Sequence, residues 1–185
     1  SMCHAQYSNH QLYEAYITRD MSVWEQYIDS ADWDELNTEQ RKQLLNYEYG
    51  FSAYILGIDT EKANRLTQRL SSHLEAMKSE LPEERYCAYL ASVYTYQLAL
   101  NNGQLMKYAK KIYSNIQHAM ELNANDPFVL SMQGNVEFYS PFGSKKTALA
   151  YYQKADSLYG VAGAEYERWN RRAVQMTYIQ CLHKL

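Results

Sequence analysis

Apolar residues recur along this chain at spacings of three and four, which is the pattern of helices that bury one face. The clearest example lies in residues 123–158, where Asp126 and Pro127 open one segment and a Ser-Pro-Phe-Gly corner closes it. A side-chain oxygen followed by proline suits the first turn of a helix. Beyond the corner, Ala148 and Tyr152 lie four residues apart on one face of a second segment. This stretch therefore predicts a helical hairpin.

The same periodicity predicts about nine helices and an all-α fold. Seven Gly and three Pro in 185 residues leave few positions for strand turns. No linker is long enough to divide the chain, so residues 1–185 are expected to form a single domain. The expected helices cover residues 7–17, 22–31, 38–55, 61–81, 83–100, 104–122, 127–139, 144–158 and 165–185, with Gly160 and Gly163 marking the last corner.

Small residues occupy matching positions in successive hairpins. Gly50, Ala91 and Gly134 are separated by 41 and 43 residues, and Ala76 and Ala119 each stand fifteen residues before the next small site. Small residues at such positions allow two helix backbones to approach closely, so the chain is expected to repeat one structural unit.

This arrangement resembles the tetratricopeptide (TPR) repeat, with its small residue on the first helix and Ala-x-x-x-aromatic group on the second. The resemblance implies a TPR-like α-α solenoid, a right-handed superhelix of antiparallel helix pairs. It is clearest over residues 38–158. The repeats exceed the standard length of about 34 residues by roughly two helical turns, which we attribute to longer helices. Two repeats lack the Ala-x-x-x-aromatic group on their second helix. One has Arg69 and His73 at these two positions, and the next has Ile112 and Ile116.

The corner at residues 139–143 also resembles that of uncharacterised secreted helical-repeat proteins of Bacteroidetes-type bacteria, and more distantly periplasmic TPR partners of TRAP transporters. This likeness implies a periplasmic or secreted location, with the cytoplasm as the alternative. Residues 1–6 fit two origins. Ser1 and Met2 suggest a cloning tag, whereas Cys3 to Gln6 suggest the end of a secretory signal cut after Ala5.

Charge and composition exclude several classes of function. The net charge is −3, with 18 basic and 21 acidic residues interspersed and no basic stripe, so a nucleic-acid partner is not expected. No apolar run approaches the roughly 18 residues that a transmembrane segment needs.

Candidate chemistry is sparse. His10, His73 and His118 have no second histidine or cysteine at helical spacing, so neither a metal site nor a cofactor is predicted. No nucleophile elbow or glycine-rich phosphate loop is present, and we expect no enzymatic activity. Cys87 and Cys181 fall inside predicted helices and are expected to be small core residues.

Tyrosine is abundant, at 19 of 185 residues, and suits a thin solenoid because its ring packs while its hydroxyl reaches a polar partner. In the resembled family, the aligned faces of the first helices line a concave groove. We expect this groove to bind a protein or peptide partner, with Tyr54, Tyr96, Phe138 and Tyr139 partly exposed at its centre. The alternative is that the terminal helices cover it. The predicted groove residues are Tyr47, Phe51, Tyr54, Ser92, Tyr96, Asn135, Phe138 and Tyr139.

The sequence therefore predicts a non-enzymatic protein- or peptide-binding scaffold of the bacterial cell envelope. The alternative is a small-molecule carrier or transporter accessory protein of the TRAP-associated TPR type. Self-association and the identity of the partner are left open.

Overall fold

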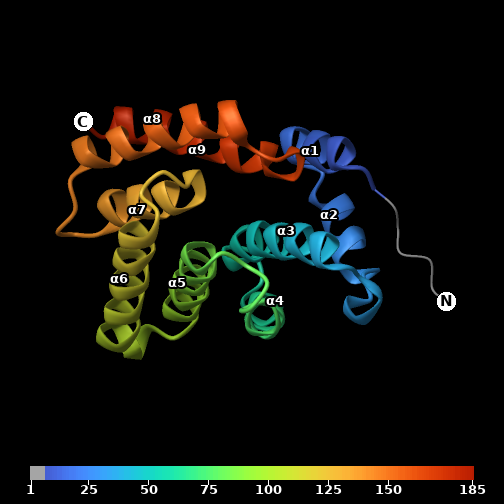
Figure 1. Cartoon of the computed structure of the whole chain (residues 1–185). Coiled ribbons are helices and arrows are strands. Elements are labelled where there is room, and N and C mark those ends of the chain that lie inside the picture. Colours follow the sequence, from blue (N-terminus) through green and yellow to red (C-terminus); the bar gives the residue numbers. More distant parts are fainter. Residues whose placement is uncertain (1–6) are drawn as a thin grey trace.

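The computed structural model describes residues 7–185, which form nine α-helices, three 3₁₀ turns and no strand (Figure 1). The all-α prediction is confirmed. Residues 1–6, to which the tag and signal predictions apply, lie outside the described residues. The elements are α1 (Asn9–Thr18), α2 (Met21–Asp29), η1 (Trp33–Glu35), α3 (Thr38–Leu56), α4 (Thr60–Ala76), α5 (Glu83–Leu100), η2 (Asn102–Gln104), α6 (Leu105–Leu122), α7 (Pro127–Tyr139), α8 (Lys145–Ala162), η3 (Glu165–Glu167) and α9 (Arg168–His183).

Polar side chains fix several helix starts. Asn37 and Gln40 exchange reciprocal side-chain to backbone hydrogen bonds at 2.9 Å before α3. The Asp126 carboxylate accepts hydrogen bonds from the backbone N–H groups of Phe128 and Val129 at the start of α7. These side chains satisfy N–H groups that have no partner within the helix. The predicted cap at Asp126 is confirmed.

Consecutive helices pack as hairpins. The pairs α3 with α4, α5 with α6 and α7 with α8 are joined by short corners, and the first helices of successive pairs also contact one another. The last helix, α9, lies along α8 and reaches back to α1, so the C-terminal hairpin runs along one side of the whole stack (Figure 1). Segments from the two ends of the sequence therefore meet.

Gly134 is the point of close approach between α7 and α8. A Cβ atom at this position would lie 2.6 Å from the Tyr152 ring, and Ala148 and Ala155 on the facing helix are fully buried. This contact is the one predicted for the hairpin. At Gly50 the neighbour is different, because a Cβ there would lie 2.6 Å from Trp169 of α9.

Two helix ends differ from the sequence prediction. Helix α4 ends at Ala76 rather than near Leu81, and the backbone turns over residues 77–81, where the Met77 side chain is fully buried. Helix α8 continues through Gly160 to Ala162. Gly160 serves a close contact instead of a break, since a Cβ at this position would lie 2.9 Å from the guanidinium of Arg171 on α9.

The interior consists of three apolar clusters. One centres on α5 with α6 and α7, one on α1 to α3 with Trp169, and one on α8 with α9. Cys87 and Cys181 are buried, unpaired members of two of these clusters, as predicted.

Candidate functional site

Four of the eight side chains predicted to line the partner groove lie in the interior. Tyr47, Phe51, Ser92 and Tyr96 are all buried. The Tyr96 hydroxyl donates a hydrogen bond to the backbone carbonyl of Tyr49 at 3.0 Å. The prediction that Tyr96 is partly exposed is therefore wrong.

The other four predicted residues reach the surface. Tyr54 is 45% exposed and Tyr139 67% exposed, whereas Asn135 and Phe138 are half-buried. Phe138 packs edge-on against Tyr139 with ring centroids 4.6 Å apart. The Asn135 side-chain carbonyl accepts a hydrogen bond from Tyr152 at 2.7 Å. The rings available to a partner are thus those at the ends of α3 and α7.

Trp169 anchors the C-terminal helix to the first helices. Its ring lies edge-on to Trp24, with centroids 5.2 Å apart, and within 5.8 Å of the Tyr16 and Tyr49 rings. These residues come from α1, α2, α3 and α9, so the two ends of the chain share one aromatic cluster. The closure of the stack by α9 matches the alternative in which terminal helices cover part of the groove.

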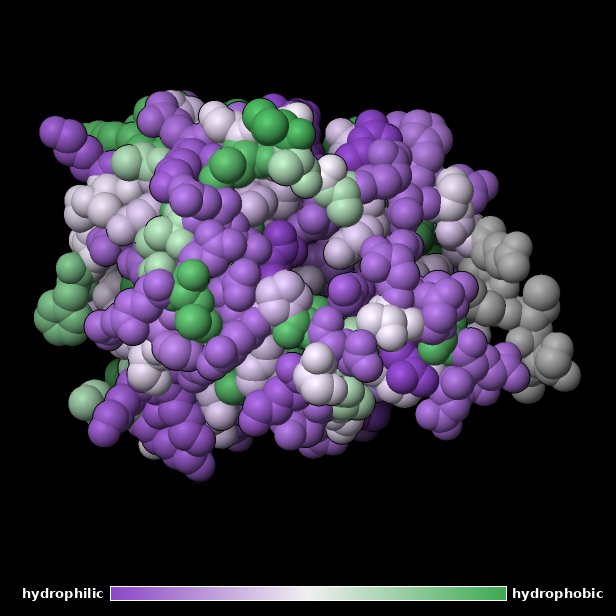
Figure 2. Space-filling model, viewed as in Figure 1, coloured by the Kyte–Doolittle hydropathy of each residue, from purple (hydrophilic) through white to green (hydrophobic). Residues whose placement is uncertain are grey.

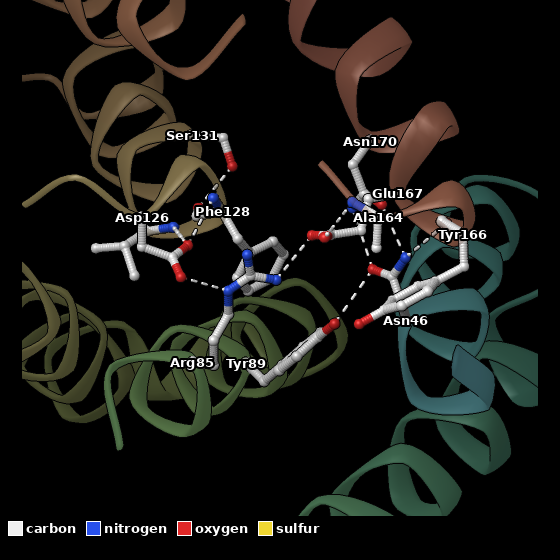
Figure 3. Close-up of polar contacts among 11 residues, drawn as sticks. Asn46, Arg85, Tyr89, Asp126, Phe128, Ser131, Ala164, Tyr166, Glu167 and Asn170 are labelled. Atoms are coloured by element: carbon white, nitrogen blue, oxygen red, sulfur yellow. Dashed lines mark hydrogen bonds and ion pairs between the residues drawn. The ribbon is translucent and has the colours of Figure 1, made fainter. Parts of the chain in front are cut away.

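A buried polar network reinforces this closure (Figure 3). The Arg85 guanidinium donates hydrogen bonds to Asp126 at 2.6 Å and to Glu167 at 2.8 Å, and so joins α5, α7 and η3. Asn46 of α3 and Asn170 of α9 pair through both amide groups, at 2.8 and 3.1 Å. Burial alone would lower the pKa of Arg85, but the two carboxylates outweigh it and raise that pKa. The guanidinium is therefore permanently charged.

A small cavity of about 50 Å³ lies beneath α9, between α3, α7 and α8. Its wall contains Asn135, Thr177 and the indole of Trp169. The Trp169 Nε1 is buried and has no hydrogen-bond partner among the described residues. A volume of this size has room for ordered water, which would satisfy such a donor.

A larger cleft of about 430 Å³ opens between α6, α7 and α8. It lies within the range of roughly 300–1,000 Å³ that small-molecule sites occupy. Helix α6 packs closely along α5 and only sparsely against α7, which leaves this wedge between them. The residues that line it are Tyr113, Ile116, Gln117, Met120, Glu121, Gln133, Val136 and Tyr151.

The lining of this cleft combines apolar walls with a few polar groups. Tyr113 crosses from α6 to the α7–α8 corner, where its hydroxyl donates a hydrogen bond to Ser140 at 2.6 Å. Lys154 lies one turn beyond Tyr151 on α8, and its ammonium donates to the carbonyl of Ala124 at 3.2 Å. The cleft thus has aromatic and aliphatic walls interrupted by Gln117, Glu121 and Gln133, and a cation, Lys154, lies one turn beyond its lining on α8.

A second buried polar cluster joins α3 to α4. Glu48 is only 1% exposed, and its carboxylate lies 2.7 Å from His73 Nδ1 and 3.3 Å from Arg69 Nε. The His73 ring stacks on Trp33 with centroids 3.9 Å apart. Arg69 compensates the charge of the buried carboxylate and His73 lies within hydrogen-bonding distance of it, so this cluster has a structural explanation. No group of three or more metal-binding side chains occurs within residues 7–185.

Sequence reasoning missed the α6–α8 cleft. The stripe of Tyr113, Ile116 and Met120 on α6 was visible as an apolar face, but the sequence does not show that α7 leaves this face partly uncovered. Glu48 was missed as well, because a carboxylate inside an apolar helix face pairs with residues more than twenty positions away.

Comparison with known proteins adds one structural likeness. No family model and no curated protein matches the sequence. The fold is similar to that of the HusA haemophore from Porphyromonas gingivalis, with a TM-score of 0.65 and 17% sequence identity over 93% of this chain and 86% of that chain. The TPR resemblance thus has no family match, and the structural likeness concerns the fold. None of the helices within residues 7–185 is both long and apolar enough to cross a membrane.

Proposed function

We propose that this chain is a non-enzymatic carrier that binds a flat, largely apolar small molecule in the α6–α8 cleft. The cleft itself is the observation that carries the proposal, because it is of ligand size, open to solvent, and lined mainly by aromatic and aliphatic side chains, with Gln117, Glu121 and Gln133 as its polar groups. This favours the carrier alternative over the protein scaffold that the sequence predicted first.

Haem is the first ligand to test. The protein of similar fold is described as a haemophore, and haem is a flat apolar macrocycle with carboxylate side chains and a central iron. The apolar walls around Ile116 and Val136 suit the macrocycle. Lys154, one turn beyond the lining residue Tyr151, is the cation we assign to a haem carboxylate. Tyr113, Tyr151 and Met120 supply phenol and thioether groups, both of which serve as axial ligands of haem iron. A carrier of this kind would act in the periplasm or outside the cell.

The test is a titration of the protein with haemin, followed by the absorbance of the Soret band. Gln133→Trp places a large ring at the cleft, and we expect it to weaken haemin binding about tenfold or more by occupying the space. Gln68→Trp, at an exposed position of α4, is the matched control and should bind as the wild type does. Equal affinity of wild type and Gln133→Trp would exclude the cleft as the site.

A protein or peptide partner is the second candidate, supported by the exposed rings of Tyr54 and Tyr139. For this function we expect Tyr54→Ala/Tyr139→Ala to lose partners that the wild type retains in a pull-down from the source organism. Haemin affinity of the same variant should be unchanged, because neither residue lines the cleft.

A further inference from the structure

The C-terminal part of the chain has a charge opposite to that of the rest. Residues 138–185 contain seven Lys and Arg and three Asp and Glu, a net charge of +4, whereas residues 1–137 contain eleven and eighteen, a net charge of −7. Residues 168–185 contain no acidic residue at all. The interspersed charges of the whole chain hide this asymmetry. Because these residues form α8, α9 and their flanking corners, the structure gathers the positive charge in one hairpin.

The positive side chains at one end of this hairpin are not neutralised. Asp156 pairs with Arg171 at 2.8 Å and Glu165 with Arg168 at 3.3 Å, both toward the α8–α9 corner. At the opposite end, Lys146 and Lys184 are exposed, and neither forms an ion pair within the described residues. Cations without an ion pair therefore remain where the α7–α8 corner meets the C-terminal end of α9, and Lys154 and Arg172 elsewhere in the hairpin also form no ion pair within the described residues.

Apolar side chains project from the same end of the molecule. Phe142, at the α7–α8 corner, is 95% exposed, and Ile179 and Leu182 are exposed near the end of α9. The two elements are neighbours, because the Cys181 thiol donates to the carbonyl of Lys145 at 3.2 Å. Figure 2 shows hydrophobic surface at the corner and beside the end of α9, with hydrophilic surface around it.

The corner holds Phe142 outward through defined contacts. Ser140 Oγ accepts hydrogen bonds from the Phe142 N–H at 3.2 Å and from the Tyr113 hydroxyl at 2.6 Å. The Glu137 carboxylate accepts one from the Ser144 N–H at 2.8 Å. Gly143 is required for this turn, since a Cβ there would lie 2.1 Å from the Glu137 carbonyl oxygen. The projecting ring is thus part of an ordered turn.

We propose that this end of the molecule, formed by Phe142, Ile179, Leu182, Lys145, Lys146 and Lys184, binds an anionic lipid surface. An apolar ring at a protruding turn can enter the boundary between headgroups and acyl chains, while flanking lysines meet anionic headgroups. A lipid surface fits better than a protein groove because Lys145 and Lys146 closely follow the projecting Phe142 in the chain, and because their charge is complementary to that of anionic headgroups. This proposal does not depend on the ligand cleft.

The test is co-sedimentation of the full chain with phosphatidylcholine vesicles, with and without phosphatidylglycerol. We expect binding to the anionic vesicles only, and its loss when salt rises from about 0.1 M to about 0.5 M. Phe142→Ala should lower the partition coefficient roughly tenfold, from the apolar area it no longer buries. Lys145→Ala/Lys146→Ala should lower it roughly thirtyfold, which corresponds to about 1 kcal/mol for each lysine.

Two matched variants act as controls. Ile58→Ala removes an exposed apolar side chain at the α3–α4 corner, and Lys110→Ala/Lys111→Ala removes two adjacent lysines of α6. Both should bind anionic vesicles like the wild type, and circular dichroism should show that all variants are folded. The proposal is wrong if the wild type stays in the supernatant with anionic vesicles, binds neutral vesicles equally, or loses no affinity in Phe142→Ala. Phe142 does not line the ligand cleft, so Phe142→Ala should bind haemin like the wild type. A loss of vesicle binding in this variant is therefore distinguishable from a failure of the proposed carrier function.

Discussion

The guanidinium of Arg85 on α5 donates a hydrogen bond at 2.8 Å to the carboxylate of Glu167 in η3, although 82 residues separate them in the sequence. The pair lies in the interior, beside the point where the C-terminal hairpin meets the first helices (Figure 3). Because Arg85 also binds Asp126, this one cation compensates two carboxylates.

Arg85→Met should therefore destabilise the fold strongly. It leaves two mostly buried carboxylates without a cation, and the expected loss is about 3–5 kcal/mol in the free energy of unfolding. Urea denaturation followed by circular dichroism measures it. Arg65→Met is the control, since Arg65 pairs with Glu61 at the surface and should cost less than about 1 kcal/mol. Similar losses in both variants would contradict the structural role of Arg85.

Gly134→Leu should separate α7 from α8. A side chain there enters the space of the Tyr152 ring, and overpacking of this kind costs about 1–3 kcal/mol. Thermal melting should show the loss as a lower midpoint. Gly57→Leu provides the comparison, because a Cβ at Gly57 meets nothing within 4 Å. An unchanged melting temperature of Gly134→Leu would refute the close contact.

Tyr96→Ala and Tyr54→Ala should differ sharply in stability. Tyr96 is buried and its hydroxyl bonds to the Tyr49 carbonyl, so its truncation should cost about 3–5 kcal/mol. Tyr54 is 45% exposed, and its truncation should cost below about 1 kcal/mol. Chemical denaturation of the two variants decides the point, and equal losses would mean that the two rings have similar environments.

Alkaline pH should unfold the protein cooperatively. Burial, reinforced by Glu48 for Tyr27 and by Glu167 for Tyr166, raises the pKa of each of these tyrosines to about 12, and burial also raises the pKa of Tyr49, Tyr89 and Tyr96. In the unfolded chain a tyrosine ionises near pH ~10. The stability that each group contributes is thus complete below about pH 10 and is lost as pH rises toward the folded-state pKa.

The slope is about 1.4 kcal/mol per pH unit for each such tyrosine, so several together should unfold the chain within roughly one unit above pH 10. Tyrosinate absorbance and helical circular dichroism should change at the same pH. Tyr166→Phe should move that midpoint upward, because it removes one of the groups. Gradual, independent ionisation with intact helices would contradict this account.

The sequence predicts correctly those features that depend on residues within one hairpin. The cap at Asp126, the small residue at Gly134 and the helix pattern itself depend on neighbours within one hairpin, and the structure confirms them. The second role of Asp126, as a partner of Arg85, was not readable, because that contact joins different hairpins.

The groove prediction is wrong where helices distant in the sequence pack against the predicted groove residues. The shared register of the first helices predicts an exposed Tyr96 only if their inner face remains open. Hydrogen bonding to Tyr49 and packing against α3 place that ring in the interior instead. The local pattern of α9 does not predict that Trp169 packs against Gly50, since the two positions are more than a hundred residues apart. The α6–α8 cleft likewise depends on packing between helices, because it exists only where α6 makes few contacts with α7. The sequence of either helix alone does not predict it.

Paramagnetic broadening of backbone amide signals by bound haemin tests the central proposal most directly, because it reports binding and location together. We expect iron(III) haemin to broaden the amides of residues 113–121, 133–136 and 151, while those of α2 and α4 remain sharp; zinc protoporphyrin, which is diamagnetic, should shift the same signals without broadening them. Absence of broadening at saturating haemin, or broadening centred away from the α6–α8 cleft, would contradict the proposal.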